Sequence, residues 1–213
     1  MIMRPDSAIG VRVAACARGE LASRLLAVRT MRWLIDGPGS DDSDAENRLH
    51  RELERVSVLL DRVVYCLAPD LIPFSPRELD VAELVASVAE RFGGQASIQI
   101  DTAHAPAIAD RAALAHALSS IIDFGLWSSD GVWVRVEGTR SDVVVSVRFS
   151  CPEDDPDLVA ALFEPVLPSS SARLGLDSVR TVARRHLGNV AATASGGSLE
   201  VTLSLPVGIT SMT

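Results

Sequence analysis

Histidine is the side chain best suited to passing a proton or a phosphoryl group near neutral pH, and this sequence has four. They are His50, His104, His116 and His186. His50 stands out because Glu54 follows it by one helical turn, with Ser57 and Asp61 at similar spacing. A carboxylate in that place could orient the imidazole for phosphoryl transfer. The alternative is a surface histidine on a solvated helix face.

The other reactive side chains form weaker patterns. His116 lies between two alanines, as packed or surface histidines do, and His186 is expected at a helix C-terminus, where a cation suits the helix dipole. The acidic run at Asp41 lacks the glycine and the terminal glutamate of a calcium loop, and the three cysteines show no CxxC spacing. Trp127 and Trp133 are expected to anchor the core beside a turn, or alternatively to form a binding surface. No metal site is predicted.

Composition excludes several classes of partner. The chain has 213 residues, 47% of them hydrophobic, which is enough to bury a core. Its formal net charge of -8 argues against binding nucleic acid, because that affinity comes from clustered Lys and Arg. The sequence has no apolar run long enough to span a membrane and no signal-peptide pattern, so we expect a cytoplasmic protein without a membrane partner.

The first seventy residues are predicted to form an antiparallel helical hairpin. Residues 7–35 contain no proline and carry an apolar stripe, and the Gly-, Pro-, Ser- and Asp-rich residues 36–44 end that helix. A narrow apolar seam follows, in which apolar residues recur at alternating steps of four and three. Its members are Leu49, Leu53, Val56, Leu60, Val63 and Leu67. A lone hairpin cannot cover both stripes, so we expect a homodimer that forms a four-helix bundle; alternatively, both stripes pack on the rest of the chain.

Three prolines in residues 68–76 mark a domain boundary. Beyond it, periodicity predicts helices over 79–92, 111–126, 156–163 and 174–186, and strands over 96–100, 132–136, 143–149, 190–194 and 199–205. This mixture predicts an α+β sandwich, in which helices cover one face of a sheet. The expected domains are the hairpin, residues 1–70, and the sandwich, residues 77–213.

Several short motifs support a family resemblance. LDVAELV (79–85) resembles the opening helix of the histidine-kinase ATPase domain, and DRAAL (110–114) resembles the lead into its asparagine-bearing helix. FEP (163–165) resembles the F box, while LGL (174–176) and HLG (186–188) resemble the second glycine box and the turn after its helix. In order and spacing, residues 45–206 resemble the core of a histidine kinase, a helical hairpin followed by an ATPase domain.

The sequence departs from that family where the nucleotide would bind. Phe124 stands where the family places the asparagine that coordinates magnesium, with Ser120 at the other usual asparagine. The adenine-reading aspartate corresponds to Phe149, beside Ser150. A phenyl ring offers a metal ion no oxygen ligand. The resemblance therefore implies a degenerate domain that binds no cofactor.

The glycine-rich segments and the phosphorylation site are altered too. Residues 151–155 contain three carboxylates instead of glycines, and Ser171 and Arg173 replace glycines that would cradle phosphate. The first helix has no histidine, and its nearest analogue of the phosphorylation motif is RGEL (18–21).

Together the resemblance and its departures imply a dimeric, non-catalytic histidine-kinase-like protein of two-component signalling. Its expected partner is a response-regulator receiver domain or a histidine kinase. One alternative is a histidine phosphotransferase that uses His50. The other is an ATP-binding regulator like the anti-sigma kinases.

Overall fold

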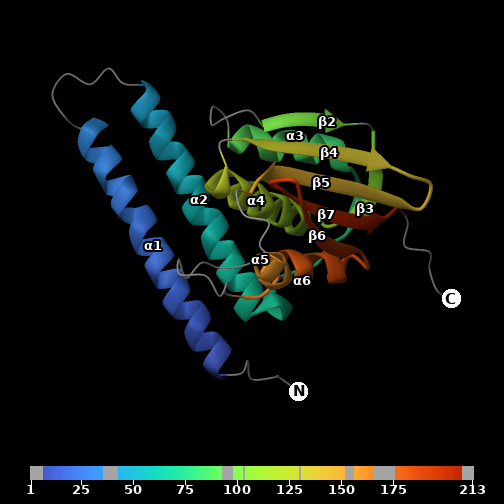
Figure 1. The fold of residues 1–213 in the computed structure, drawn as a ribbon, viewed down its shortest axis with the longest axis horizontal. Helices are drawn as coiled ribbons and strands as arrows, with labels where there is room; N and C mark the ends of the chain where they lie inside the picture. The colour runs from blue at the N-terminus through green and yellow to red at the C-terminus, as the bar shows by residue number, and fades with distance from the viewer. Residues whose placement is uncertain are drawn as a thin grey trace.

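The protein has an α+β fold, as predicted. A helical hairpin lies beside a sandwich, in which helices cover a β-sheet. The computed structural model describes residues 7–35, 43–92, 98–102, 104–129, 131–151, 156–165 and 176–207. The helices are α1 (Ser7–Ile35), α2 (Ser43–Leu67), α3 (Val81–Arg91), α4 (Arg111–Ser128), α5 (Pro156–Ala161) and α6 (Asp177–Arg185). The strands are β1 (Arg77–Asp80), β2 (Ile98–Thr102), β3 (Pro106–Ala109), β4 (Val132–Gly138), β5 (Asp142–Ser150), β6 (Asn189–Ser195) and β7 (Ser198–Pro206). Figure 1 shows the hairpin on one side of the sandwich.

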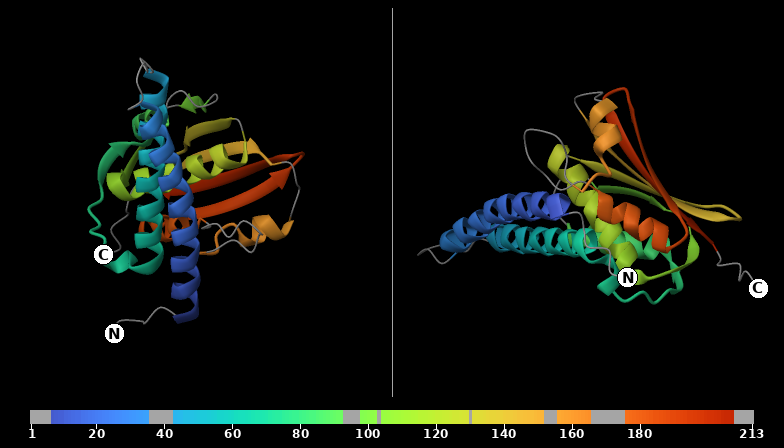
Figure 2. Two further views of the ribbon diagram at one scale, coloured as in Figure 1. Left: turned by 90° about the vertical axis from the view of Figure 1, so that its left-hand side faces the viewer. Right: turned by 90° about the horizontal axis from the view of Figure 1, so that it is seen from below.

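The main sheet has the strand order β2-β4-β5-β7-β6, with β2 parallel to β4 and the other pairs antiparallel. Strands β4, β5 and β7 alternate buried and more exposed residues, so one face of the sheet is covered. Val134, Val147 and Val201 lie in register on the covered face and are fully buried. Helices α3, α4 and α6 cover that face, and α2 packs on α4 and α6 from outside (Figure 2).

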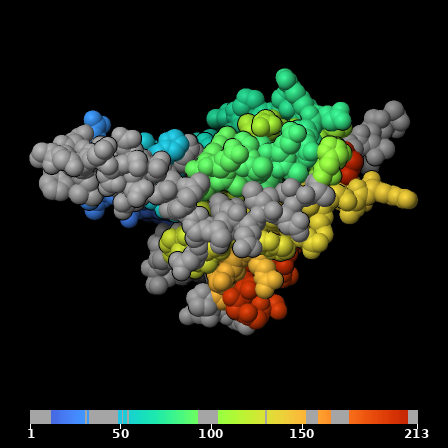
Figure 3. Space-filling view, turned by 90° about the horizontal axis from the view of Figure 1, so that it is seen from above, coloured from blue at the N-terminus to red at the C-terminus, as the bar shows by residue number. Residues whose placement is uncertain are grey.

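The hairpin has an apolar core of its own. Val13 and Cys16 of α1 pack against Leu59 of α2, and Val63 and Leu67 join them. The last two belong to the seam expected to meet a second copy, but here they pack against the hairpin's own core. The hairpin lies at one end of the molecule, and the turn between β4 and β5 at the other (Figure 3).

Two aspartates start the helices that build the sandwich. Asp80 accepts a hydrogen bond from the backbone N–H of Ala82 and begins α3, and Asp110 accepts one from Ala113 and begins α4. The backbone N–H of Ser75 also donates to Asp110, at 2.6 Å. The linker between hairpin and sandwich is therefore tied to the start of α4.

Arg185 of α6 fixes the same linker from the other side. Its guanidinium donates to the carbonyl oxygen of Ile72 at 2.8 Å and, at 3.5 Å, to that of Pro69. It also lies 4.8 Å from the centre of the Phe74 ring, a cation–π contact. These contacts hold the linker, and with it the C-terminal end of α2, against α6.

Among the residues that the structure describes, no helix is both long and apolar enough to cross a membrane.

Candidate functional site

Aromatic rings fill the space between α4 and the end of β5, where the sequence comparison places magnesium and adenine ligands. Phe124 and Phe149 are buried, and their ring centres lie 5.9 Å apart. A Cβ added to Gly125 would lie 2.8 Å from Phe149 Cδ1, so the ring packs directly on the helix backbone. The two positions therefore meet in space, and each contributes a hydrocarbon ring where an oxygen ligand would be needed.

The apolar packing continues beyond this aromatic pair. Leu162 and Leu176 are fully buried, and the Leu176 backbone N–H donates to the Leu162 carbonyl oxygen at 2.7 Å. Phe163 is buried beneath Arg180, whose guanidinium carbon lies 5.4 Å from the ring centre. The residues that replace the family's glycines, at 152–155, Ser171 and Arg173, lie outside the described residues. The side chains described at positions 124 and 149 offer a magnesium nucleotide no oxygen ligand.

A second feature joins the hairpin to the sandwich. Helix α4 is buried along most of its length, but three of its polar residues recur at helical spacing on the side facing α2. They meet arginines and a tyrosine of the hairpin. We call this interface the polar seam, formed by His116, Ser120 and Asp123 of α4, Arg55, Arg62 and Tyr65 of α2, and Arg24 of α1.

Asp123 is the centre of an ion cluster in the polar seam. The Arg24 guanidinium donates to its two carboxylate oxygens, at 3.1 and 3.4 Å. Arg55 lies 3.6 Å away, and the fully buried Arg62 lies 3.9 Å away. Glu52 completes the cluster, 2.6 Å from Arg55 and 3.8 Å from Arg24. Charges held this far from water are costly unless they are paired, so the loss of one partner would leave an uncompensated buried charge.

His116 also lies in the polar seam, and its ring is neutral. It stacks on Tyr65 with ring centres 4.2 Å apart and an angle of 5° between the ring planes. Neither of its ring nitrogens has a hydrogen-bond partner among the described residues. Burial, with a smaller contribution from the Arg62 charge, lowers the pKa of His116 from 6.5 to about 3. The sequence allowed a packed or a surface histidine here, and the structure shows the packed one.

His186 corrects one expectation. It caps the C-terminus of α6, as predicted, but it is buried, and burial lowers its pKa. Its Nδ1 lies 2.8 Å from the Val182 carbonyl oxygen, and its Nε2 accepts the backbone N–H of Asp110 at 2.9 Å. These partners require a neutral ring with the proton on Nδ1, so the expected favourable cation at this helix end is wrong.

His50 is exposed on α2, and so are Ser57 and Asp61. This agrees with the solvated helix face that the sequence indicated. The side chain of Glu54, the proposed orienting carboxylate, lies outside the described residues. The structure thus leaves His50 open to a partner.

The hairpin carries an apolar stripe that is about half exposed. On α2, Leu53, Leu60 and Val64 are spaced by seven and four residues, and each is about half exposed. They point away from Arg62, which faces α4. Leu25 of α1 is exposed to a similar degree. Of the other residues in the predicted seam, Leu49 and Val56 are partly buried.

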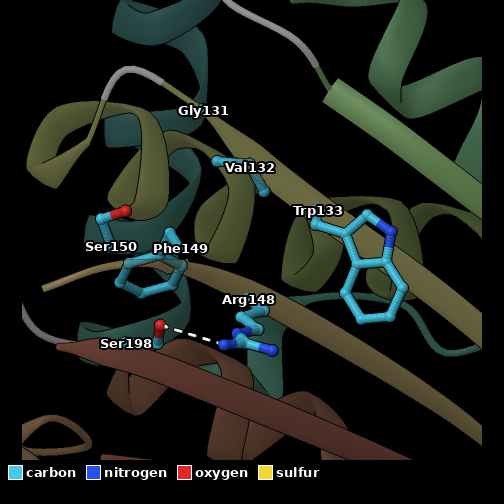
Figure 4. Close-up of a pocket in the computed structure, with 7 residues that line it drawn as sticks. All are labelled: Gly131, Val132, Trp133, Arg148, Phe149, Ser150 and Ser198. Carbon is cyan, nitrogen blue, oxygen red and sulfur yellow. Dashed lines mark hydrogen bonds between the residues drawn. The ribbon is translucent and has the colours of Figure 1, made fainter. Parts of the chain in front are cut away.

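A shallow groove of about 460 Å³ lies near the ends of β4, β5 and β7 (Figure 4). Trp133 and Arg148 are cross-strand neighbours there on the face away from the helices, and Arg148 donates to the Ser198 hydroxyl at 3.3 Å. The groove is lined by Gly131, Val132, Trp133, Arg148, Phe149, Ser150 and Ser198. Trp127 is half exposed at the end of α4, so the expectation of a core anchor is wrong for it.

The polar seam is the feature that sequence reasoning missed. Arg24 and Asp123 are 99 residues apart, and a charged residue on a helix ordinarily indicates a solvated face. The one available signal was the position of Asp123 and Arg62 inside apolar helix segments.

Comparisons with known proteins agree on the fold. No protein-family model matches the sequence, and no curated protein matches it significantly. Solved structures do match. The histidine kinase AdeS of Acinetobacter baumannii aligns over 88% of this chain and 97% of its own, with a TM-score of 0.61 and 18% identity.

Two further structures match in the same way. Histidine kinase ThkA, in complex with the response regulator TrrA, aligns over 92% of this chain and 61% of its own, with a TM-score of 0.63 and 16% identity. The histidine kinase domain of the E. coli osmosensor EnvZ aligns over 65% of this chain and 94% of its own, with a TM-score of 0.53 and 20% identity. The chain has the fold of a histidine-kinase core, in which a helical hairpin is followed by an ATPase-type sandwich.

Proposed function

We propose that this protein is a dimeric, non-catalytic histidine-kinase-like protein of two-component signalling that binds a receiver domain or a partner kinase. The observation that carries the proposal is the contact between Phe124 and Phe149, which leaves hydrocarbon where a nucleotide would need oxygen ligands. The complex of ThkA with the response regulator TrrA supports a receiver as the kind of partner.

The absence of nucleotide binding can be tested by calorimetric titration with ATP and magnesium. We expect no saturable heat at millimolar ATP for the unmodified protein. The variant Phe149→Ala is a matched control, because it removes a ring without adding an oxygen ligand, and it should behave the same. A saturable isotherm for the unmodified protein would favour the ATP-binding regulator instead.

The proposed dimer rests on the apolar stripe of the hairpin. A second copy packing on Leu53, Leu60 and Val64 would bury side chains that are about half exposed in the single chain. A charge at Leu60 would then be costly to desolvate, so Leu60→Glu should give a monomer by light scattering. Leu71→Glu is the control, since Leu71 is 82% exposed on the linker and lies outside the stripe. A monomeric unmodified protein would refute this assembly.

The partner is best tested by direct binding to a panel of purified receiver domains. The unmodified protein should bind at least one of them without ATP. Failure of every receiver, together with capture of a full-length histidine kinase, would favour the partner-kinase form of the proposal.

The histidine phosphotransferase is the second candidate, because His50 is exposed on the hairpin. Its test is incubation with a phosphorylated receiver domain, followed by detection of acid-labile label on the chain. The non-catalytic proposal predicts receiver binding without label. Label that is lost in His50→Ala, and kept in a His104→Ala control, would establish the phosphotransferase.

The division into residues 1–70 and 77–213 is part of the same proposal. The hairpin has a separate apolar core, centred on Val13, Cys16 and Leu59, which supports treating it as a unit.

A further inference from the structure

The hairpin and the sandwich meet through both apolar and polar side chains. Among the described hairpin residues, only Val58 and Tyr65 belong to the apolar core of the sandwich. The rest of the contact with α4 is the polar seam, including the fully buried Arg62. Interfaces between domains that move against each other are typically more polar than domain cores. The plane of the polar seam therefore has the polar character of an interface between movable domains.

His116 makes this plane sensitive to protons. Its ring is stacked on Tyr65 of α2 and has no hydrogen-bond acceptor within reach among the described residues. A proton added to the buried ring would place a second cation beside Arg62, with nothing to accept the new N–H. Separation of α2 from α4 would expose the ring to water and remove both costs.

We propose that the hairpin and the sandwich separate along the polar seam in mildly acidic solution, and that protonation of His116 triggers the separation. The linker stays attached, because Arg185 holds the carbonyl oxygens of Pro69 and Ile72 and contacts the ring of Phe74. The movement is thus a rotation about the linker. It keeps the hairpin core of Val13, Cys16 and Leu59, and it withdraws Val58 and Tyr65 from the apolar core of the sandwich.

The direction follows from the pKa of His116, which is about 3 in the closed form and 6.5 when exposed. A depressed histidine pKa stabilises the closed form fully above pH 6.5, and this stabilisation is lost as the pH falls toward 3. At pH 5 the open-to-closed ratio should be about 30-fold higher than at pH 7.5, from this group alone.

Other charged groups lie in the polar seam or beside it and add their own pH dependence. They are Glu20 and Arg24 of α1, Glu52, Arg55, Asp61 and Arg62 of α2, Asp123 of α4, and Asp177 of α6. Burial raises the pKa of Asp61 and of Asp177, so their protonation opposes opening as the pH falls. The contribution of His116 is therefore read from a comparison of variants.

The experiment is small-angle scattering with circular dichroism on the full chain from pH 7.5 to pH 5. The unmodified protein should expand while its helix and strand signals persist. His116→Phe keeps a ring on Tyr65 but cannot take up a proton, so it should stay compact. His104→Phe changes a histidine whose side chain is 78% exposed, and it should expand like the unmodified protein.

Three results would overturn the proposal. One is a compact unmodified protein at pH 5, and another is equal expansion of His116→Phe. The third is loss of secondary structure at the same pH as the expansion, which would mean unfolding. If His116→Phe does not fold, the imidazole signals of the unmodified protein decide by NMR. His116 must titrate together with the expansion, and titration without expansion would also refute the trigger.

Discussion

Replacing Asp123 with asparagine should destabilise the protein far more than a single surface charge would. Asp123 is 2% exposed and is the carboxylate that Arg24, Arg55 and Arg62 share. The neutral amide takes away the negative charge that these three arginines share, and Glu20 and Glu52 remain beside Arg24. Removing one partner of a buried ion pair typically costs about 3–5 kcal/mol. In a chain of this size, that lowers the melting temperature by roughly 10 °C.

The assay is urea denaturation followed by circular dichroism, with thermal melting as a second measure. Glu137→Gln is the matched control, because Glu137 pairs with Arg135 at 2.7 Å while both side chains are about half exposed. Such a surface pair is worth less than about 1 kcal/mol. A double-mutant cycle with Arg24→Gln should show that Asp123→Asn costs less once Arg24 is gone. Equal losses for Asp123→Asn and Glu137→Gln would refute the reasoning.

Three further predictions concern the sandwich and the hairpin. The pKa of His186 is lowered in the fold, so this residue stabilises the folded protein above pH 6.5 and does so less as the pH falls. The variant His186→Gln cannot titrate, and its unfolding free energy should therefore fall less between pH 6.5 and pH 5 than that of the unmodified protein. Burial raises the pKa of the Cys66 thiol to about 11, so at pH 8 it should react with a disulfide reagent about 100-fold more slowly than in urea, measured by mass spectrometry. Gly188→Ala would place a Cβ 2.1 Å from the Ser204 carbonyl oxygen, so this variant should melt well below the unmodified protein in calorimetry; an unchanged melting temperature would show that the backbone there shifts freely.

The sequence predicted the long-period elements well. The expected helix over residues 7–35 coincides with α1, and the paired strands around residues 138–140 are β4 and β5. Strong periodicity extends over many residues in these elements, so the pattern outweighs local exceptions. The strands β1 and β3 were not predicted, because each has only four residues. The buried positions of β3 do alternate, but all four of its residues are apolar, so the sequence shows no alternation there.

The loss of nucleotide ligands at the candidate site stays a prediction, and the polar seam was not predicted at all. Reading Phe124 and Phe149 as filled ligand positions needed only alignment with known motifs, and the structure brings the two rings together. The polar seam depends on which faces of α1, α2 and α4 meet, and helix periodicity indicates a face without naming its partner. Asp123 and Arg62 therefore read as ordinary helix residues until the fold placed them in contact.

The clamp of Arg185 on the linker has a mechanical consequence. It makes the C-terminal end of α2 a pivot. The guanidinium holds the backbone of Ile72 and the ring of Phe74, while the 25 residues of α2 extend away from them. That helix is about 37 Å long, so a rotation of roughly 10° at its base moves its far end by about 6 Å. A lever of this length converts a small change beside α6 into a displacement large enough to realign the distal ends of the hairpin.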